Sequence, residues 1–223
     1  MSNRFEVKRQ YSFSDAMLLQ LTDSVISNGT RDTVQLDPEG VTLTRLAALK
    51  TLNNNFLNME DDVEWKGLVS IKTEEKNAAL EVCETASNKV RRMAENTFGE
   101  GRGKYNRFDF DGINRLQDVL RIRAYHRIHR RATANAIALA AEGLTPAFLT
   151  AFKDACLAAD DAYDVTIDTI ENRDEAKEER IALGNLLYAE VLKICNTGKS
   201  YWIDKSESRY NDYVISASGI NAG

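Results

Sequence analysis

A segment of the chain occurs twice. Residues 39–50 read EGVTLTRLAALK and residues 142–153 read EGLTPAFLTAFK, which gives six identities in twelve positions at an offset of 103 residues. The same offset pairs Asp61 with Asp164 farther along the chain. A repeat restricts the fold, because both copies form the same supersecondary unit and bury their apolar surface together.

Each copy is about a hundred residues long. The letters KYNRF at 104–108 match RYNDY at 209–213 at an offset of 105, and YSFS at 11–14 matches FDFD at 108–111. A rival alignment pairs the NRF at 3–5 with the NRF at 106–108, which leaves the N-terminal boundary open. We assign residues 1–107 to copy 1, with an N-terminal extended arm, and residues 108–223 to copy 2, with a C-terminal extended arm.

The scarcity of proline predicts long helices. Only Pro38 and Pro146 occur in 223 residues, so more than a hundred residues between them contain no helix breaker of this kind. Thr42 and Thr145 are candidate N-caps, and Pro146 then takes the first helical position. A heptad seam follows, which is typical of coiled-coil-like packing: Leu149, Phe152, Cys156, Ala159, Tyr163, Thr166 and Ile170.

Further start and stop signals divide each copy. N-cap residues at Ser14 and Asp111 predict first helices over 14–27 and 112–141, and copy 1 has a break in its apolar seam at 59–62. Charged segments at 72–75 and 171–174 predict turns before the last helices, which Gly99 and Gly198 are expected to end. The sequence therefore predicts an all-α protein: an elongated antiparallel bundle of about six helices, built from two tandem copies.

Two terminal segments have strand-like composition. Residues 4–13 alternate apolar and polar side chains, and residues 210–223 place aromatic and β-branched residues before small ones. An extended arm can add backbone hydrogen bonds to a neighbouring molecule. We expect the arms to mediate self-association through Phe5, Val7, Tyr11, Phe13, Tyr213, Val214, Ile215 and Ile220.

Residues 121–131 contain five arginines, and the segment 160–179 is acidic. Opposite charges on successive helices favour pairing within the chain or between subunits over a solvated face or a nucleic-acid site. Such pairs add little stability but select register and orientation. The expected contact residues are Arg121, Arg123, Arg127, Arg130, Arg131, Asp160, Asp161, Asp164 and Asp168.

No pattern indicates a catalytic, metal or cofactor site. Gly198-Lys199-Ser200 lacks the earlier glycine of a phosphate-binding loop, and His126 and His129 have no Glu-x-x-His partner for a di-metal site. The cysteines at 83, 156 and 195 lie far apart on apolar stripes, as buried thiols do. We therefore expect neither enzymatic activity nor a small-molecule substrate.

These observations favour a non-enzymatic structural protein that self-associates into an ordered homo-oligomer or filament. A helical adaptor that binds another protein is the alternative, and a nucleic-acid binder is less favoured because the net charge is −5 and the pI is about 5.3. Without an apolar leader or an eighteen-residue apolar run, the expected location is the cytoplasm and no membrane partner is expected.

Overall fold

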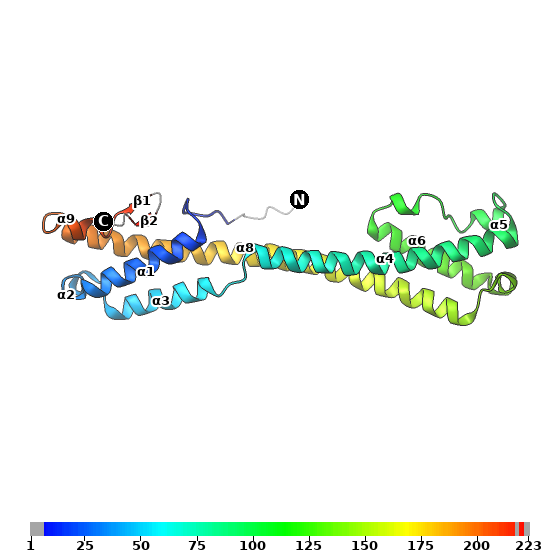
Figure 1. The fold of residues 1–223 in the computed structure, drawn as a ribbon, viewed down its shortest axis with the longest axis horizontal. Helices are drawn as coiled ribbons and strands as arrows, with labels where there is room; N and C mark the ends of the chain where they lie inside the picture. The colour runs from blue at the N-terminus through cyan, green and yellow to red at the C-terminus, as the bar shows by residue number, and fades with distance from the viewer. Residues whose placement is uncertain (1–6, 217–218, 221–223) are drawn as a thin grey trace. The chain divides into compact units, whose positions relative to one another are not determined.

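The computed structural model describes residues 7–216 and 219–220 and is all-α (Figure 1). Three short 3₁₀ turns, Asp37–Glu39, Ile113–Arg115 and Ala140–Glu142, lie between helices, and the two-residue strands β1 (Ile215–Ser216) and β2 (Gly219–Ile220) pair antiparallel. The α-helices are, in chain order, α1 (Asp15–Arg31), α2 (Thr33–Leu36), α3 (Leu43–Leu57), α4 (Asp62–Phe98), α5 (Gly103–Asn106), α6 (Asp118–Ala134), α7 (Ala136–Leu139), α8 (Pro146–Trp202) and α9 (Glu207–Asn211). None of the helices in the described part has both the length and the apolar character needed to cross a membrane.

The helices form two compact units, and each unit contains the last long helix of the other sequence copy. Unit 1 consists of Met1–Asp62 and Asp174–Gly223, and unit 2 consists of Val63–Arg173. Unit 1 therefore combines α1 and α3 of the predicted copy 1 with the second half of α8, which belongs to copy 2. Unit 2 combines α6 and the first half of α8 with α4, which belongs to copy 1. The predicted division at residues 107 and 108 describes the sequence copies, whereas the compact units divide the chain elsewhere.

The bounds of the elements recur at the offset seen in the sequence. Helices α1 and α6 both have 17 residues and begin 103 residues apart, and α2 and α7 and the 3₁₀ turns after them show the same offset. Gly40 and Gly143 end those turns with φ of 85° and 95°, a conformation that favours glycine. The predicted longer first helix over 112–141 is therefore wrong, because Phe108, Phe110 and Ile113 form a buried loop before α6 begins.

Three predicted N-caps are confirmed. Ser14, Thr42 and Thr145 accept hydrogen bonds from backbone amides three residues later at 3.2, 3.1 and 3.1 Å. Pro146 opens α8 as predicted. The predicted cap at Asp111 is wrong, because Gly112 next to it has a φ of 72° and helix α6 starts six residues later.

The break at 59–62 is confirmed, but the turns predicted at 72–75 and 171–174 are wrong. Helix α3 ends at Leu57 and α4 begins at Asp62, after which α4 and α8 continue through both charged segments. Neither segment contains glycine or proline, and charged side chains in the middle of a helix are tolerated at exposed positions. Lys72 and Glu75 form an ion pair of 2.9 Å one turn apart.

The long helices bury matching faces in the two units. Gly99 ends α4 with a φ of 81°, as predicted. The seam residues of α8 in unit 2 are buried or half-buried, as the heptad pattern predicts. The equivalent positions of α4 and α8 are 104 residues apart: Leu80, Cys83, Ser87, Val90 and Ala94 correspond to Gly184, Leu187, Val191, Ile194 and Gly198.

Two of these glycines receive aromatic rings from the terminal segments. A Cβ atom on Gly184 would lie 2.5 Å from the Tyr11 hydroxyl, and one on Gly198 would overlap the ring of Tyr213. The prediction that Gly198 ends the helix is therefore wrong. Gly198 lies inside α8 and lets an aromatic ring contact the helix backbone. Both terminal segments thus pack on unit 1.

We predict that Gly198→Ala destabilises the protein by about 2 kcal/mol, because the methyl group displaces the buried Tyr213 ring. Gly67→Ala is the matched control: Gly67 lies in α4 with open space around it, so alanine is expected to stabilise the helix by about 0.5–1 kcal/mol. Urea denaturation followed by circular dichroism measures both changes. Equal effects of the two substitutions would contradict the close packing at Gly198.

Candidate functional sites

The N-terminal segment is held on unit 1 by a half-buried cluster around Asp15. The Tyr11 hydroxyl donates to the Asp15 carboxylate at 2.8 Å, and the guanidinium groups of Arg9 and Arg180 both lie 2.8 Å from the same carboxylate. Arg180 also donates to the backbone carbonyl of Met59 at 2.9 Å. Burial and the neighbouring carboxylate raise the pKa of Tyr11, so its hydroxyl stays protonated and keeps donating.

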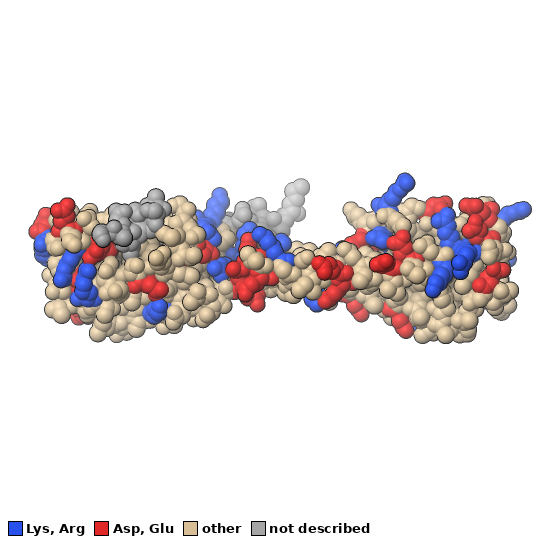
Figure 2. Space-filling model, viewed as in Figure 1, with Lys and Arg blue, Asp and Glu red and all other residues tan. Residues whose placement is uncertain are grey.

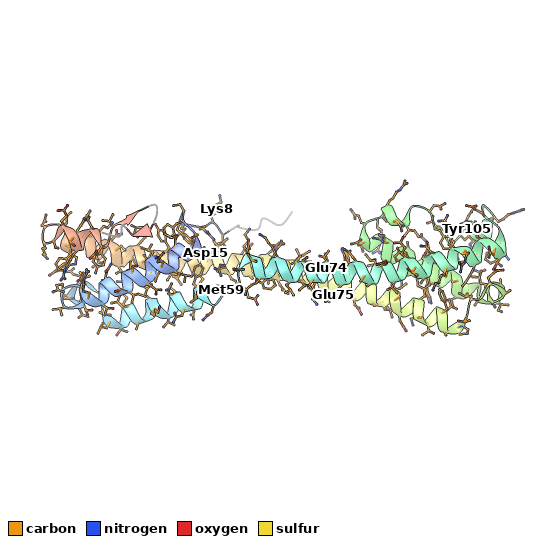
Figure 3. All side chains as sticks on the ribbon, viewed as in Figure 1. Lys8, Asp15, Met59, Glu74, Glu75 and Tyr105 are labelled. Atoms are coloured by element: carbon orange, nitrogen blue, oxygen red, sulfur yellow. The ribbon has the colours of Figure 1, made fainter. Side chains whose placement is uncertain are left out.

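Backbone hydrogen bonds reinforce this attachment. The amide group of Asn185 in α8 donates to the carbonyl of Lys8 at 2.8 Å and accepts from the N–H of Gln10 at 2.8 Å. Figure 3 places Lys8, Asp15 and Met59 near one another in this part of unit 1. The described residues of the N-terminal segment are therefore bonded to their own unit.

The C-terminal segment is held by the buried carboxylate of Asp32. Arg31 donates to both oxygens of Asp32 at 2.8 Å, Arg209 donates to one at 2.8 Å, and the hydroxyl of Tyr213 donates to the other at 3.0 Å. The side chain of Asp32 is 0% exposed. Burial alone raises the pKa of this carboxyl, but the hydrogen bonds and the two positive charges outweigh burial and hold the pKa below its usual value.

The predicted self-association residues mostly pack inside unit 1. Tyr11 and Tyr213 are buried, and Phe13 and Ile215 are half-buried against the same core, so these four side chains pack on their own unit. Tyr11 and Tyr213 lie against glycines of α8, and Phe13 packs against Tyr11 and Tyr188. Self-association through these residues stays a prediction. Val7 and Val214 are half-buried, whereas Phe5 and the side chain of Ile220 lie outside the described part.

The arginines of α6 form ion pairs with residues other than the predicted aspartates. Arg121 pairs with Glu84 of α4 at 3.4 Å, and Arg127 pairs with Asp109 at 2.8 Å. The four predicted aspartates of α8 are exposed. In the described part of the chain, no ion pair is present at these aspartates or at the three other predicted arginines: Asp160, Asp161, Asp164, Asp168, Arg123, Arg130 and Arg131. The two runs therefore do not pair with each other among the described residues of one chain, where α4 and the loop before α6 supply the carboxylates for Arg121 and Arg127. Pairing of the two runs between subunits stays a prediction. On the face drawn in Figure 2, acidic and basic side chains are interspersed.

The three cysteines and His129 pack among apolar residues. Cys83, Cys156 and Cys195 are free and buried, and burial raises the pKa of Cys195 to about 12. His129 lies edge-on to Phe152 at 5.8 Å, and burial lowers its pKa. Among residues 7–216 and 219–220, no group of three or more histidine, cysteine or carboxylate side chains is arranged to hold a metal ion.

Two hollows of unit 2 were not predicted from the sequence. One is a polar cavity of about 350 Å³ between α4, α6 and the loop before α6, with Ser87, Arg91 and Tyr125 among its lining residues. The other is an apolar groove of about 570 Å³ between α4 and α8, lined by Val82, Phe148 and several alanines. The sequence shows that the two copies differ at some of the lining positions, as at Phe148 and Arg45, but this difference does not by itself predict a hollow.

A third feature is a pair of exposed aliphatic side chains at equivalent positions. Val34 in α2 is 85% exposed and Ile137 in α7 is 96% exposed, and they lie 103 residues apart. Leu36 and Leu139, two residues after each, are fully buried and also 103 residues apart. Each unit thus presents one β-branched side chain to solvent at the same place in its fold.

Comparisons with protein families, with characterised proteins and with solved structures find no match for this chain. The functional argument therefore depends on the geometry of the two units.

We predict that Asp32→Asn lowers the free energy of unfolding by about 3 kcal/mol at pH 7, because two guanidinium groups then face a neutral amide. Because the folded-state pKa of Asp32 is lowered, its contribution is present above the unfolded value of about 3.9 and is lost as the pH falls through the folded-state value. The difference in the free energy of unfolding between the wild type and Asp32→Asn should therefore be smaller at pH 3 than at pH 7 when both are measured by urea denaturation. Asp204→Asn, at an exposed position, is the control and should change stability little at either pH.

Proposed function

We propose that the chain is a non-enzymatic structural protein that assembles with copies of itself, head to tail, into an ordered oligomer or filament. The contact joins the α2 surface of one molecule to the α7 surface of the next. This assignment replaces the terminal arms by surfaces that are exposed in both units.

The recurrence of Val34 and Ile137 carries the proposal. These are the two most exposed large aliphatic side chains in the described part of the chain, and they occupy equivalent positions of the two copies. Single exposed apolar residues are common on protein surfaces and require no explanation. Two that recur at the offset of the repeat give each molecule two related contact surfaces, which is what an open assembly requires.

Charge favours contact between unlike surfaces over contact between like ones. Asp37 and Glu39 follow α2 and are exposed, whereas Arg131 lies in the last turn of α6, before α7, and Arg130 precedes it. These four side chains form no ion pair among the described residues. An α2 surface with negative neighbours therefore complements an α7 surface with positive ones.

Each contact is expected to be weak. Burying one valine or isoleucine side chain contributes about 1.5–3 kcal/mol, which is less than the cost of about 4–15 kcal/mol for joining two molecules. The neighbouring charges and backbone must contribute the rest. Assembly should therefore grow steeply with protein concentration and weaken as salt is added.

Sedimentation velocity over a range of concentrations tests the proposal with Val34→Ser and Ile137→Ser. Each variant alone should remain monomeric, because each lacks one of the two surfaces that a head-to-tail contact needs. An equimolar mixture should form dimers and nothing larger, since the mixture holds one intact pair of surfaces. The wild type should form larger particles that electron microscopy resolves as chains.

Leu57→Ser is the matched control, because Leu57 is 61% exposed but its equivalent in copy 2 is Asp160. This variant should assemble as the wild type does. A wild-type protein that stays monomeric at every concentration contradicts the proposal. Dimers of Val34→Ser alone would mean that like surfaces pair, which contradicts the head-to-tail arrangement.

A second candidate function is an adaptor, which the apolar groove of unit 2 favours. In unit 1 the equivalent place holds Arg45, which lies 3.1 Å from Glu190. The equivalents of these residues in unit 2 are Phe148 and Ala86, and the groove is open. Small alanines allow a helix to approach closely, and Glu81 and Lys89 lie two turns apart along the groove. The fitting occupant is an amphipathic helix of another protein with opposite charges at that spacing.

Ala86→Glu tests the adaptor, because it introduces the residue that unit 1 has at the equivalent position. Fluorescence anisotropy with a labelled eighteen-residue amphipathic peptide of leucine, lysine and glutamate should show binding to the wild type and at least about tenfold weaker binding to Ala86→Glu. Asn77→Glu adds the same charge to α4 outside the groove and should bind as the wild type does. Absence of binding to the wild type contradicts this function.

A further inference from the structure

The apolar groove between α4 and α8 in unit 2 has an acidic rim. Asp154 and Asp161 of α8 and Glu81 of α4 are exposed, and none of the three forms an ion pair within the described part of the chain. Glu81 also lines the groove directly. These carboxylates are open to solvent and remain available to a positively charged partner.

Helix geometry places both aspartates along one edge of the groove. The alanines of α8 that line the groove belong to a row that continues past it at spacings of four and three residues: Ala151, Ala155, Ala158 and Ala162. Asp154 and Asp161 each follow an alanine of this row by three residues, so they lie on the same flank of the row, about two turns apart. The other flank, with Phe152 and Ala159, is buried in the core. The two aspartates therefore border the row on its solvent side.

The acidic rim is a property of unit 2 alone. At the offset of the repeat, the three acids correspond to uncharged side chains of unit 1: Thr51, Asn58 and Asn185. The packing of the helices in this fold therefore does not require a carboxylate at any of the three positions. Acidic side chains that appear only beside the open groove favour a role in binding.

We propose that the groove binds a basic amphipathic helix of another protein. This inference rests on the adaptor function and specifies its partner. The bound helix lays its apolar face on the alanine row, and two of its lysine or arginine side chains, seven residues apart, contact Asp154 and Asp161. A third basic side chain contacts Glu81, and an acidic one contacts Lys89, which lines the groove two turns farther along α4. Charges at the rim of an interface select the partner and its orientation.

Three eighteen-residue peptides with the same seam of leucine and alanine test the proposal. They carry lysine, glutamine or glutamate at two flank positions seven residues apart, and fluorescence anisotropy with the full chain measures the affinity of each. At low salt the lysine peptide should bind about tenfold more tightly than the glutamate peptide, with the glutamine peptide between them. Added salt should reduce this preference, because the rim charges are exposed.

Two double variants locate the effect on the surface of α8. Asp154→Asn combined with Asp161→Asn should lose most of the preference for the lysine peptide. Asp160→Asn combined with Asp164→Asn is the matched control, because it changes the net charge equally but on the side of α8 opposite the alanine row. The control should keep the preference of the wild type. All four aspartates are exposed, so both variants should fold as the wild type does.

The outcomes separate this inference from the adaptor function. If the wild type binds all three peptides with equal affinity, the inference is wrong and the adaptor function stands. An equal loss of preference in both double variants also contradicts the inference, because the effect would then follow net charge instead of position. If the wild type binds none of the three peptides, the adaptor function and the inference are both wrong.

Discussion

Burial of the apolar face of α8 is the constraint on which both units depend. Phe152, Cys156 and Ala159 supply this face to the core of unit 2, and Leu187 and Val191 supply it to the core of unit 1. No proline follows Pro146, and the charged segment at 171–174 lacks a breaker, so one helix serves both units. Because α4 likewise continues without a turn, each unit takes its last helix from the other sequence copy.

The two units share their elements but have diverged in chemistry. Unit 1 uses Asp32 to hold the C-terminal segment, whereas the side chain of the equivalent Asn135 donates to the carbonyl of Arg131 in its own helix. Unit 1 has the ion pair between Arg45 and Glu190 at the place where unit 2 has an open apolar groove.

Local signals predicted local structure well. The caps at Ser14 and Thr42 depend on one side-chain oxygen and the next turn, and both are present. The charged segments were misread as turns because charge alone does not break a helix when the side chains reach solvent. Gly198 was misread as a helix end because a glycine inside a helix and a glycine after one look alike in sequence. The two hollows of unit 2 are not predicted by the sequence, because sequence alone does not show which faces of α4, α6 and α8 meet.

The sequence by itself determined the all-α class, the offset of the repeat, the start of α8 and the face that α8 buries, because these follow from residue spacing within a few turns of helix. Only the tertiary structure decided the exchange of last helices, the burial of Tyr11 and Tyr213 against glycines of α8, and the two hollows of unit 2. The sequence of an irregular segment is the same whether its aromatic side chains contact a neighbouring molecule or the core of their own unit. The outcome depends on which distant surface has room for the ring, and that is a property of the packed helices.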